Sequence, residues 1–228
     1  MFNAGLLLAQ IFGISFITFL CLKIGRQAVN SWLVVLAISL NLMILKQVNI
    51  FGLDVTTCKA LGVCYILGLN LMQEYYGKRE AQVHVLIAAL CTFGFVMLQQ
   101  MHMIFIPNEF DTTQGHYSAI FSCMPLITAV SFITFIFIQL LDIRFFGWLQ
   151  EVIGAKKLTT RVVISLAMSQ TVDTLVFYGL LSFFEDIWGN VWHVIAFTLL
   201  IKVVIIFLIT PYTALANKLV DKEAIARY

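Results

Sequence analysis

The stretch WHVIAFTLLIKVVIIFLITPYTAL, Trp192–Leu215, decides the fold class of this chain. It is apolar almost throughout and carries a single charged residue, Lys202. A helix needs about 20 such residues to cross the roughly 30 Å hydrocarbon core of a bilayer. The stretch therefore predicts a transmembrane helix.

The rest of the chain has the same character. Of its 228 residues, 61% are hydrophobic and 11% charged, and the mean hydropathy is +0.95, whereas soluble domains carry about 25% charged residues. The runs are too long for barrel strands of about 10 residues. We therefore predict an all-α integral membrane helical bundle of about seven transmembrane helices, a single transmembrane domain over residues 1–228. The other six predicted spans are Gly5–Leu22, Trp32–Ile50, Cys58–Tyr76, Val83–Ile106, Ala119–Leu141 and Val162–Phe184.

The basic residues outside the spans predict the orientation, because short positively charged loops stay cytoplasmic. All of them fall in alternate loops or in the C-terminal tail: Lys23, Arg26, Lys78, Arg79, Arg144, Lys156, Lys157, Arg161, Lys218, Lys222 and Arg227. The opposite loops contain acidic residues and no Lys or Arg. We predict an external N-terminus and a cytoplasmic C-terminus. The net charge of +2 comes from these loops, so it indicates no nucleic-acid partner.

The sequence predicts no signal peptide, disulfide framework, metal site or nucleotide-binding loop. The first span lacks a positive n-region and its apolar stretch is longer than that of a signal peptide, so we expect a retained helix. The five cysteines form no CxxC pair and the four histidines are scattered, which predicts neither a disulfide framework nor a metal site. We expect no cofactor. Since no nucleotide-binding loop is present, ATP-driven transport would need a separate ATPase subunit.

Charges inside the spans are few, and each is a candidate for function. Lys46 and Lys59 lie near the outer ends of their spans, where long side chains reach the interface. Glu74 precedes Lys78 by one helical turn, so a local ion pair and a functional role are both open. Asp142 and Arg161 lie at matching depth on either side of one cytoplasmic loop, which predicts a structural or gating ion pair.

Asp173 lies near the middle of its span, and Gln170, Thr174 and Phe177 share its helical face. An amide, a carboxylate, a hydroxyl and an aromatic ring together suit a flat polar heterocycle. The alternative is a polar clamp between helices. Lys202 lies at the depth of Asp173 on the next helix, which predicts an ion pair. The sequence leaves open whether Asp173 and Lys202 bind a substrate or only each other.

Several short motifs, taken together, resemble one family. They are Glu74-Tyr75-Tyr76-Gly77-Lys78-Arg79, Gln139-Leu140-Leu141-Asp142, Arg161, Ser169-Gln170-Thr171-Val172-Asp173-Thr174 with Phe177, Lys202, and Thr210-Pro211. Their order and spacing resemble the queuosine precursor transporter family, also called the vitamin uptake transporter family. The resemblance extends from about Asn41 to Lys218. The span Gly5–Leu22 precedes it and would be an addition to a six-helix core.

The resemblance implies a multi-pass importer in the bacterial inner membrane. Its substrates would be 7-deazaguanines used for queuosine in tRNA: 7-cyano-7-deazaguanine, 7-aminomethyl-7-deazaguanine or queuine. It also implies functional roles for Glu74, Gln170, Asp173 and Lys202. The chain has Asn70 where many members have aspartate, so the preferred precursor stays open. The complete predicted substrate site, near the midplane between the third, sixth and seventh spans, comprises Asn70, Glu74, Gln170, Asp173, Thr174, Phe177 and Lys202.

Other functions are consistent with parts of the sequence. The chain could be the substrate-binding subunit of an ATP-driven vitamin importer, and transport could instead depend on a proton, an ion gradient or metabolic trapping. A retinal photoreceptor also has seven helices and a lysine in the last, but here Thr198 precedes Lys202 by four residues, where microbial rhodopsins typically have aspartate. HExxH and GxSxG spacings are absent from the sequence. We therefore do not predict an enzyme.

Overall fold

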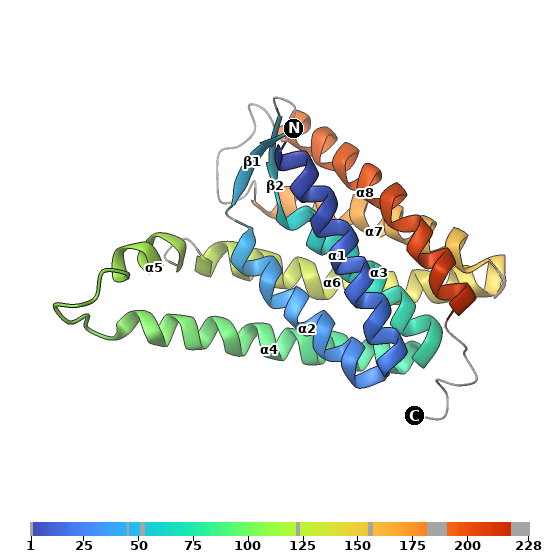
Figure 1. The fold of residues 1–228 in the computed structure, drawn as a ribbon, viewed down its shortest axis with the longest axis horizontal. Helices are drawn as coiled ribbons and strands as arrows, with labels where there is room; N and C mark the ends of the chain where they lie inside the picture. Colours follow the sequence, from blue (N-terminus) through green and yellow to red (C-terminus); the bar gives the residue numbers. More distant parts are fainter. Residues whose placement is uncertain are drawn as a thin grey trace.

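The computed structural model describes residues 2–44, 46–50, 53–121, 124–154, 157–181 and 191–219. A long helix overlaps each predicted span (Figure 1), which confirms the helical membrane bundle. The helices are α1 (Phe2–Ile24), α2 (Arg26–Met43), α3 (Cys58–Tyr76), α4 (Lys78–Ile104), α5 (Gln114–Phe121), α6 (Met124–Ile153), α7 (Leu158–Leu181) and α8 (Val191–Leu219). The strands are β1 (Gln47–Ile50) and β2 (Leu53–Thr56).

Five segments are long and apolar enough to cross a bilayer, counted over the described residues. They are Phe2–Ile24, Lys78–Ile104, Val130–Ile153, Leu158–Leu180 and Ile195–Ala216. The two remaining long helices, α2 and α3, have 18 and 19 residues. The count of seven spans and the orientation of the termini therefore stay predictions.

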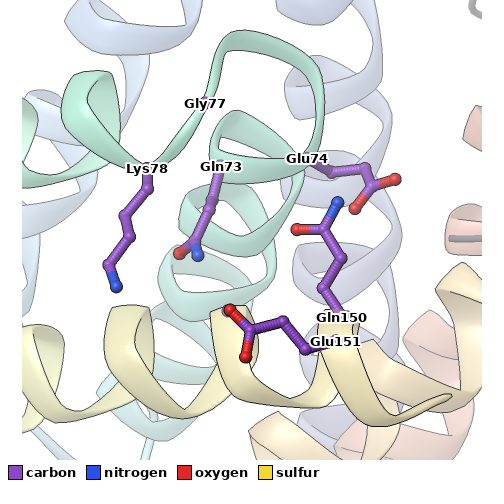
Figure 2. Close-up of a pocket in the computed structure, with 7 residues that line it drawn as sticks. Gln73, Glu74, Gly77, Lys78, Gln150 and Glu151 are labelled. Atoms are coloured by element: carbon purple, nitrogen blue, oxygen red, sulfur yellow. The ribbon is translucent and has the colours of Figure 1, made fainter. Parts of the chain in front are cut away.

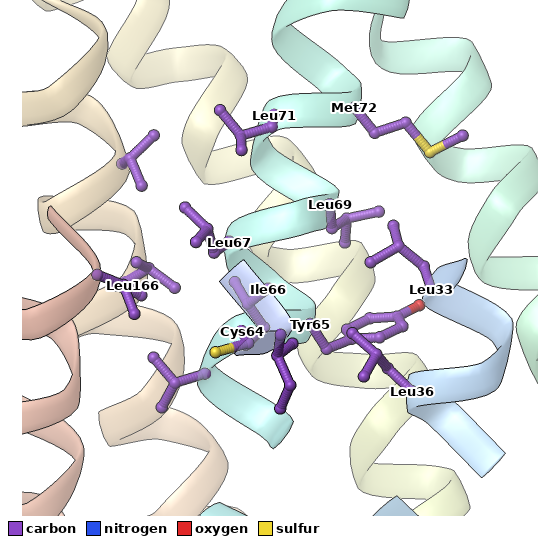
Figure 3. Packing of buried hydrophobic residues seen from close by; sticks show 14 of the residues in the cluster. Leu33, Leu36, Cys64, Tyr65, Ile66, Leu67, Leu69, Leu71, Met72 and Leu166 are labelled. Carbon is purple, nitrogen blue, oxygen red and sulfur yellow. The ribbon is translucent and has the colours of Figure 1, made fainter. Parts of the chain in front are cut away.

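Helix α3 is the centre of the bundle. It packs against all six other long helices of the described chain, and most of its residues from Cys58 to Glu74 are buried. Figure 3 shows α3 side chains such as Tyr65 and Leu67 among Leu33 of α2 and Leu166 of α7. Because α3 contacts other helices over most of its surface, its polar residues are shielded from the surroundings of the bundle.

Gly68 allows α3 to lie close to α2 and α1. An added Cβ would collide with Cδ2 of Leu33 and would lie 3.5 Å from both Leu33 Cγ and Thr18 Cγ2. Leu33 is fully buried, so it has little room to move.

Replacing Gly68 with alanine is therefore expected to lower the free energy of unfolding by about 1–3 kcal/mol, the usual effect of overpacking. Gly94→Ala in α4 is the matched control, because a Cβ there would meet nothing within 4 Å. Both substitutions gain the same helix propensity, so their difference isolates the packing effect. Thermal unfolding in detergent measures it, and equal midpoints for the two variants would contradict the prediction.

The second predicted span, Trp32–Ile50, ends too late. Helix α2 stops at Met43, and Gln47–Ile50 pairs with Leu53–Thr56 as an antiparallel hairpin in which Val48 lies opposite Val55. β-branched residues in both strands favour this conformation. The Asn3 amide at the start of α1 donates to the main-chain oxygen of Asn49 at 2.9 Å. The hairpin therefore lies beside the N-terminal end of α1 (Figure 1).

The fifth predicted span, Ala119–Leu141, has the wrong bounds. Its first residues belong to the short helix α5, and α6 continues as far as Ile153. The helix continues because Ile143, Phe146 and Leu149 are buried and extend its apolar face. As a result, Asp142 lies well inside a helix rather than at the end of one.

Candidate functional site

Lys202 of α8 is bonded to one face of α7. Its Nζ atom donates to Asp173 Oδ2 at 2.7 Å, to Thr174 Oγ1 at 3.0 Å and to the main-chain oxygen of Gln170 at 3.5 Å. Positions 170, 173 and 174 can all reach one neighbour because they share a helical face. The predicted Asp173–Lys202 ion pair is confirmed.

A second lysine lies against the same two helices. Lys59 Nζ of α3 donates to Thr198 Oγ1 of α8 at 2.7 Å. That its side chain extends to the membrane interface stays a prediction. The Tyr178 hydroxyl lies 3.5 Å from the same Thr198 oxygen, and the Phe177 and Tyr178 rings pack edge to face at 5.5 Å. We call the whole set the α7–α8 cluster: Lys59, Gln170, Asp173, Thr174, Phe177, Tyr178, Thr198 and Lys202.

Lys59 and Thr198 were not among the site residues predicted from the sequence. A signal for Thr198 existed, because it precedes Lys202 by one helical turn and shares its face. Lys59 had no such signal, since its partner is remote in the sequence.

The α7–α8 cluster combines two ammonium groups with a single carboxylate. The Lys202 side chain is 8% exposed, whereas that of Asp173 is 34% exposed. Lys202 thus holds one carboxylate oxygen while part of the carboxylate stays accessible. Chemically, the cluster can accept paired N–H donors at Asp173, donate from Lys59 or Lys202, and stack a flat ring on Phe177 or Tyr178.

Glu74 lies outside this cluster. Its Oε2 atom accepts from Arg161 Nη1 at 2.8 Å, and both side chains are fully buried. Arg161 and Asp173 are twelve positions apart on α7, which corresponds to about 18 Å along the helix axis. The single predicted site is therefore divided between two depths of the bundle.

The predicted Asp142–Arg161 ion pair was wrong, and the local Glu74–Lys78 pair, one of the two alternatives left open for Glu74, is not formed. Glu74 does not share a helix with Lys78, because Gly77 has a φ of 95° and separates α3 from α4. Arg161 bonds to Glu74 instead of Asp142. Asp142 Oδ1 accepts hydrogen bonds from Ser165 and Ser169 of α7 at 2.6 and 2.5 Å. Asn70, the remaining predicted site residue, is fully buried on α3, one turn before Glu74.

A cavity of about 330 Å³ opens beside Glu74, at the junction of α3 and α4 and against the last turns of α6 (Figure 2). Gln73 Nε2 donates a hydrogen bond to the main-chain oxygen of Ile143 on α6 at 3.0 Å. The cavity lies at the end of the bundle where the predicted cytoplasmic loops meet, and Glu74 of the buried Glu74–Arg161 pair forms part of its wall. Its lining is polar or glycine throughout: Gln73, Glu74, Gly77, Lys78, Gly147, Gln150 and Glu151.

His84 belongs to a separate buried group. Its Nε2 lies 2.8 Å from the Tyr65 hydroxyl and its Nδ1 lies 2.5 Å from Asn30 Oδ1. Both ring nitrogens are thus used to join α2, α3 and α4. This arrangement indicates a structural role.

The helices that carry these buried polar groups belong to a stretch of the sequence that matches a known family. Residues 61–216 match the family described as "Putative vitamin uptake transporter". The chain belongs to this family. It is 28% identical over 203 residues to a protein of Bacillus subtilis (strain 168) described as "Probable queuosine precursor transporter", with 87% of each chain covered. No solved structure matches the chain.

Membership of the vitamin uptake transporter family makes the chain a transporter and a multi-pass bacterial membrane protein. The matched residues begin in α3 and end in α8. They include every residue of the α7–α8 cluster except Lys59, and also both members of the Glu74–Arg161 pair.

Proposed function

We propose that this transporter imports queuosine precursors across the bacterial inner membrane, for the modification of tRNA. The substrates are 7-deazaguanine bases: 7-cyano-7-deazaguanine, 7-aminomethyl-7-deazaguanine or queuine. The observation that carries the proposal is the partly exposed Asp173 carboxylate, held by Lys202 next to two aromatic rings. The name of the Bacillus subtilis relative supports the same substrate class.

The chemistry of the α7–α8 cluster fits such a base. A 7-deazaguanine has a ring N–H and an exocyclic amino group on one edge, and a carboxylate accepts two parallel donors of this kind. The neighbouring base carbonyl needs a donor, which Lys202 or Lys59 supplies. The flat ring can stack on Phe177 or Tyr178. Gln170 contributes its main-chain oxygen to the position of Lys202.

The test measures thermal unfolding of the purified protein with a panel of bases, followed by uptake of the labelled base that binds. A ligand that binds only the folded protein stabilises it by about 2.7 kcal/mol at 100 times its Kd. We expect a 7-deazaguanine to raise the unfolding midpoint. Adenine is the control, because its Watson–Crick edge lacks the paired ring N–H and amino donors. The absence of any shift with all three 7-deazaguanines would contradict the proposal.

A further inference from the structure

Asp142 is a fully buried carboxylate without a cationic partner. Three ion pairs are present among the described residues, and none includes Asp142. Its Oδ1 atom accepts from Ser165 and Ser169, whereas its Oδ2 atom has no hydrogen-bond partner in the described part of the chain. A carboxylate inside a membrane needs a compensating positive charge, and two hydroxyl groups do not provide one.

Two more polar side chains, one on α6 and one on α3, have a buried oxygen atom without a hydrogen-bond partner in the described part of the chain. Gln139 precedes Asp142 by one turn of α6, and its Oε1 atom is unpartnered within the described ranges. The amide of Asn70 on α3 has no partner at either its oxygen or its nitrogen. Asn70 is 0% exposed and Gln139 is 4% exposed. Buried polar atoms are nearly always hydrogen-bonded, so each of these atoms calls for a water, an ion or another ligand as its partner.

The packing of α3, α6 and α7 places these residues at the same depth in the bundle. Gln73 of α3 bonds to Ile143 of α6, and Glu74 of α3 bonds to Arg161 of α7. Asn70 is one turn before both α3 residues and on the same face. One helical turn in the same direction, away from the Glu74–Arg161 pair, leads from Ile143 to Gln139 on α6. On α7 it leads from Arg161 to Ser165, the hydrogen-bond partner of Asp142.

We propose that Asp142, Gln139, Asn70, Ser165 and Ser169 form a sodium-binding site between α3, α6 and α7. Together they provide side-chain oxygen atoms of the carboxylate, amide and hydroxyl types, which are the ligands that hard cations prefer. A single carboxylate balances a charge of +1, which selects a monovalent over a divalent ion. Transporters place coupling ions near the membrane midplane. The site is next to the α7–α8 cluster, because Ser169 directly precedes Gln170, whose main-chain oxygen accepts from Lys202.

A proton is the main alternative, and it explains less of the geometry. Protonation would neutralise Asp142 and give its hydroxyl one hydrogen bond to donate. It would supply at most one of the two amide oxygens with a donor. A bridging water would supply donors but would not compensate the negative charge. On α3 and α7, the charged residues closest in sequence to the proposed ligands are Glu74 and Arg161. These two already pair with each other. On α4, His84 bonds to Tyr65 and Asn30.

The test is a sodium titration of the purified full-length protein, monitored by thermal unfolding at constant ionic strength and without any organic substrate. We expect a saturable rise in the unfolding midpoint with NaCl that KCl and choline chloride do not produce. Asp142→Asn should weaken the apparent sodium affinity by at least about tenfold, because it removes the only charge among the ligands. Thr171→Ala is the matched control, since this exposed hydroxyl bonds to the main chain of its own helix. It should keep the sodium response of the unmodified protein.

The result that would overturn the proposal is an unfolding midpoint that does not depend specifically on sodium. A midpoint that responds to pH but not to sodium would assign Asp142 to a proton instead. If Asp142→Asn does not fold, Gln139→Leu and Ser169→Ala decide the question, and an unchanged sodium affinity in both would also overturn the proposal. The titration uses no base, so a wrong substrate assignment would leave its outcome unaffected.

Discussion

Replacing Arg161 with methionine is expected to lower the free energy of unfolding by about 3–5 kcal/mol, the usual effect of removing one member of a buried ion pair. Glu74 and Arg161 are fully buried, and 2.8 Å separates their bonded atoms. The substitution leaves the Glu74 carboxylate inside the bundle without the guanidinium that compensates its charge. It also removes the contact between Arg161 and the Phe146 ring, which lies 5.3 Å away.

Denaturant or thermal unfolding in detergent measures this effect. Arg26→Met is the matched control, because the Arg26–Glu80 pair has side chains that are 48% and 33% exposed. Exposed pairs contribute about 1 kcal/mol or less, so the control should unfold close to the unmodified protein. The double variant Glu74→Leu with Arg161→Met should regain much of the lost stability, because neither charge remains. A single variant as stable as the Arg26 control would show that the pair is not important for the fold.

The substitution Asp173→Asn is expected to reduce kcat/KM for uptake of the 7-deazaguanine by about 10–100-fold. Hydrogen bonds to charged groups contribute about 1.5–3 kcal/mol, and an unmatched donor costs more. The asparagine amide would place an N–H group where the carboxylate accepts one from the base. It would also leave Lys202, which is 8% exposed, without its carboxylate. Initial uptake rates over a range of base concentrations, normalised to the amount of inserted protein, provide the measurement.

A double variant separates substrate binding from a purely structural clamp. Asp173→Asn with Lys202→Met removes both charges, so its unfolding midpoint should recover toward that of the unmodified protein. If Asp173 contacts the base, uptake stays low although stability recovers. Recovery of uptake together with stability would show that the two residues only join α7 to α8, and would contradict the proposed site.

The Asp173–Lys202 pair was predictable because it joins two helices that follow each other in the chain. The two residues lie on consecutive antiparallel helices, so counting residues from the connecting turn was enough to match their depths. The hydrophobic runs likewise determined where the long helices lie. The true end of α6 was also readable, since Ile143, Phe146 and Leu149 continue the helical period beyond Leu141.

Contacts between helices that are distant in the chain were not predictable in this way. Glu74 bonds to Arg161, and Lys59 bonds to Thr198, across helices that are not consecutive. The central position of α3, with its buried Asn70, is of the same kind. Hydropathy depends on local sequence, so the sequence by itself determined the membrane fold and the polar face around Asp173. Only the tertiary structure decided which polar faces meet, because the rotation and neighbours of each helix depend on the packing of the whole bundle.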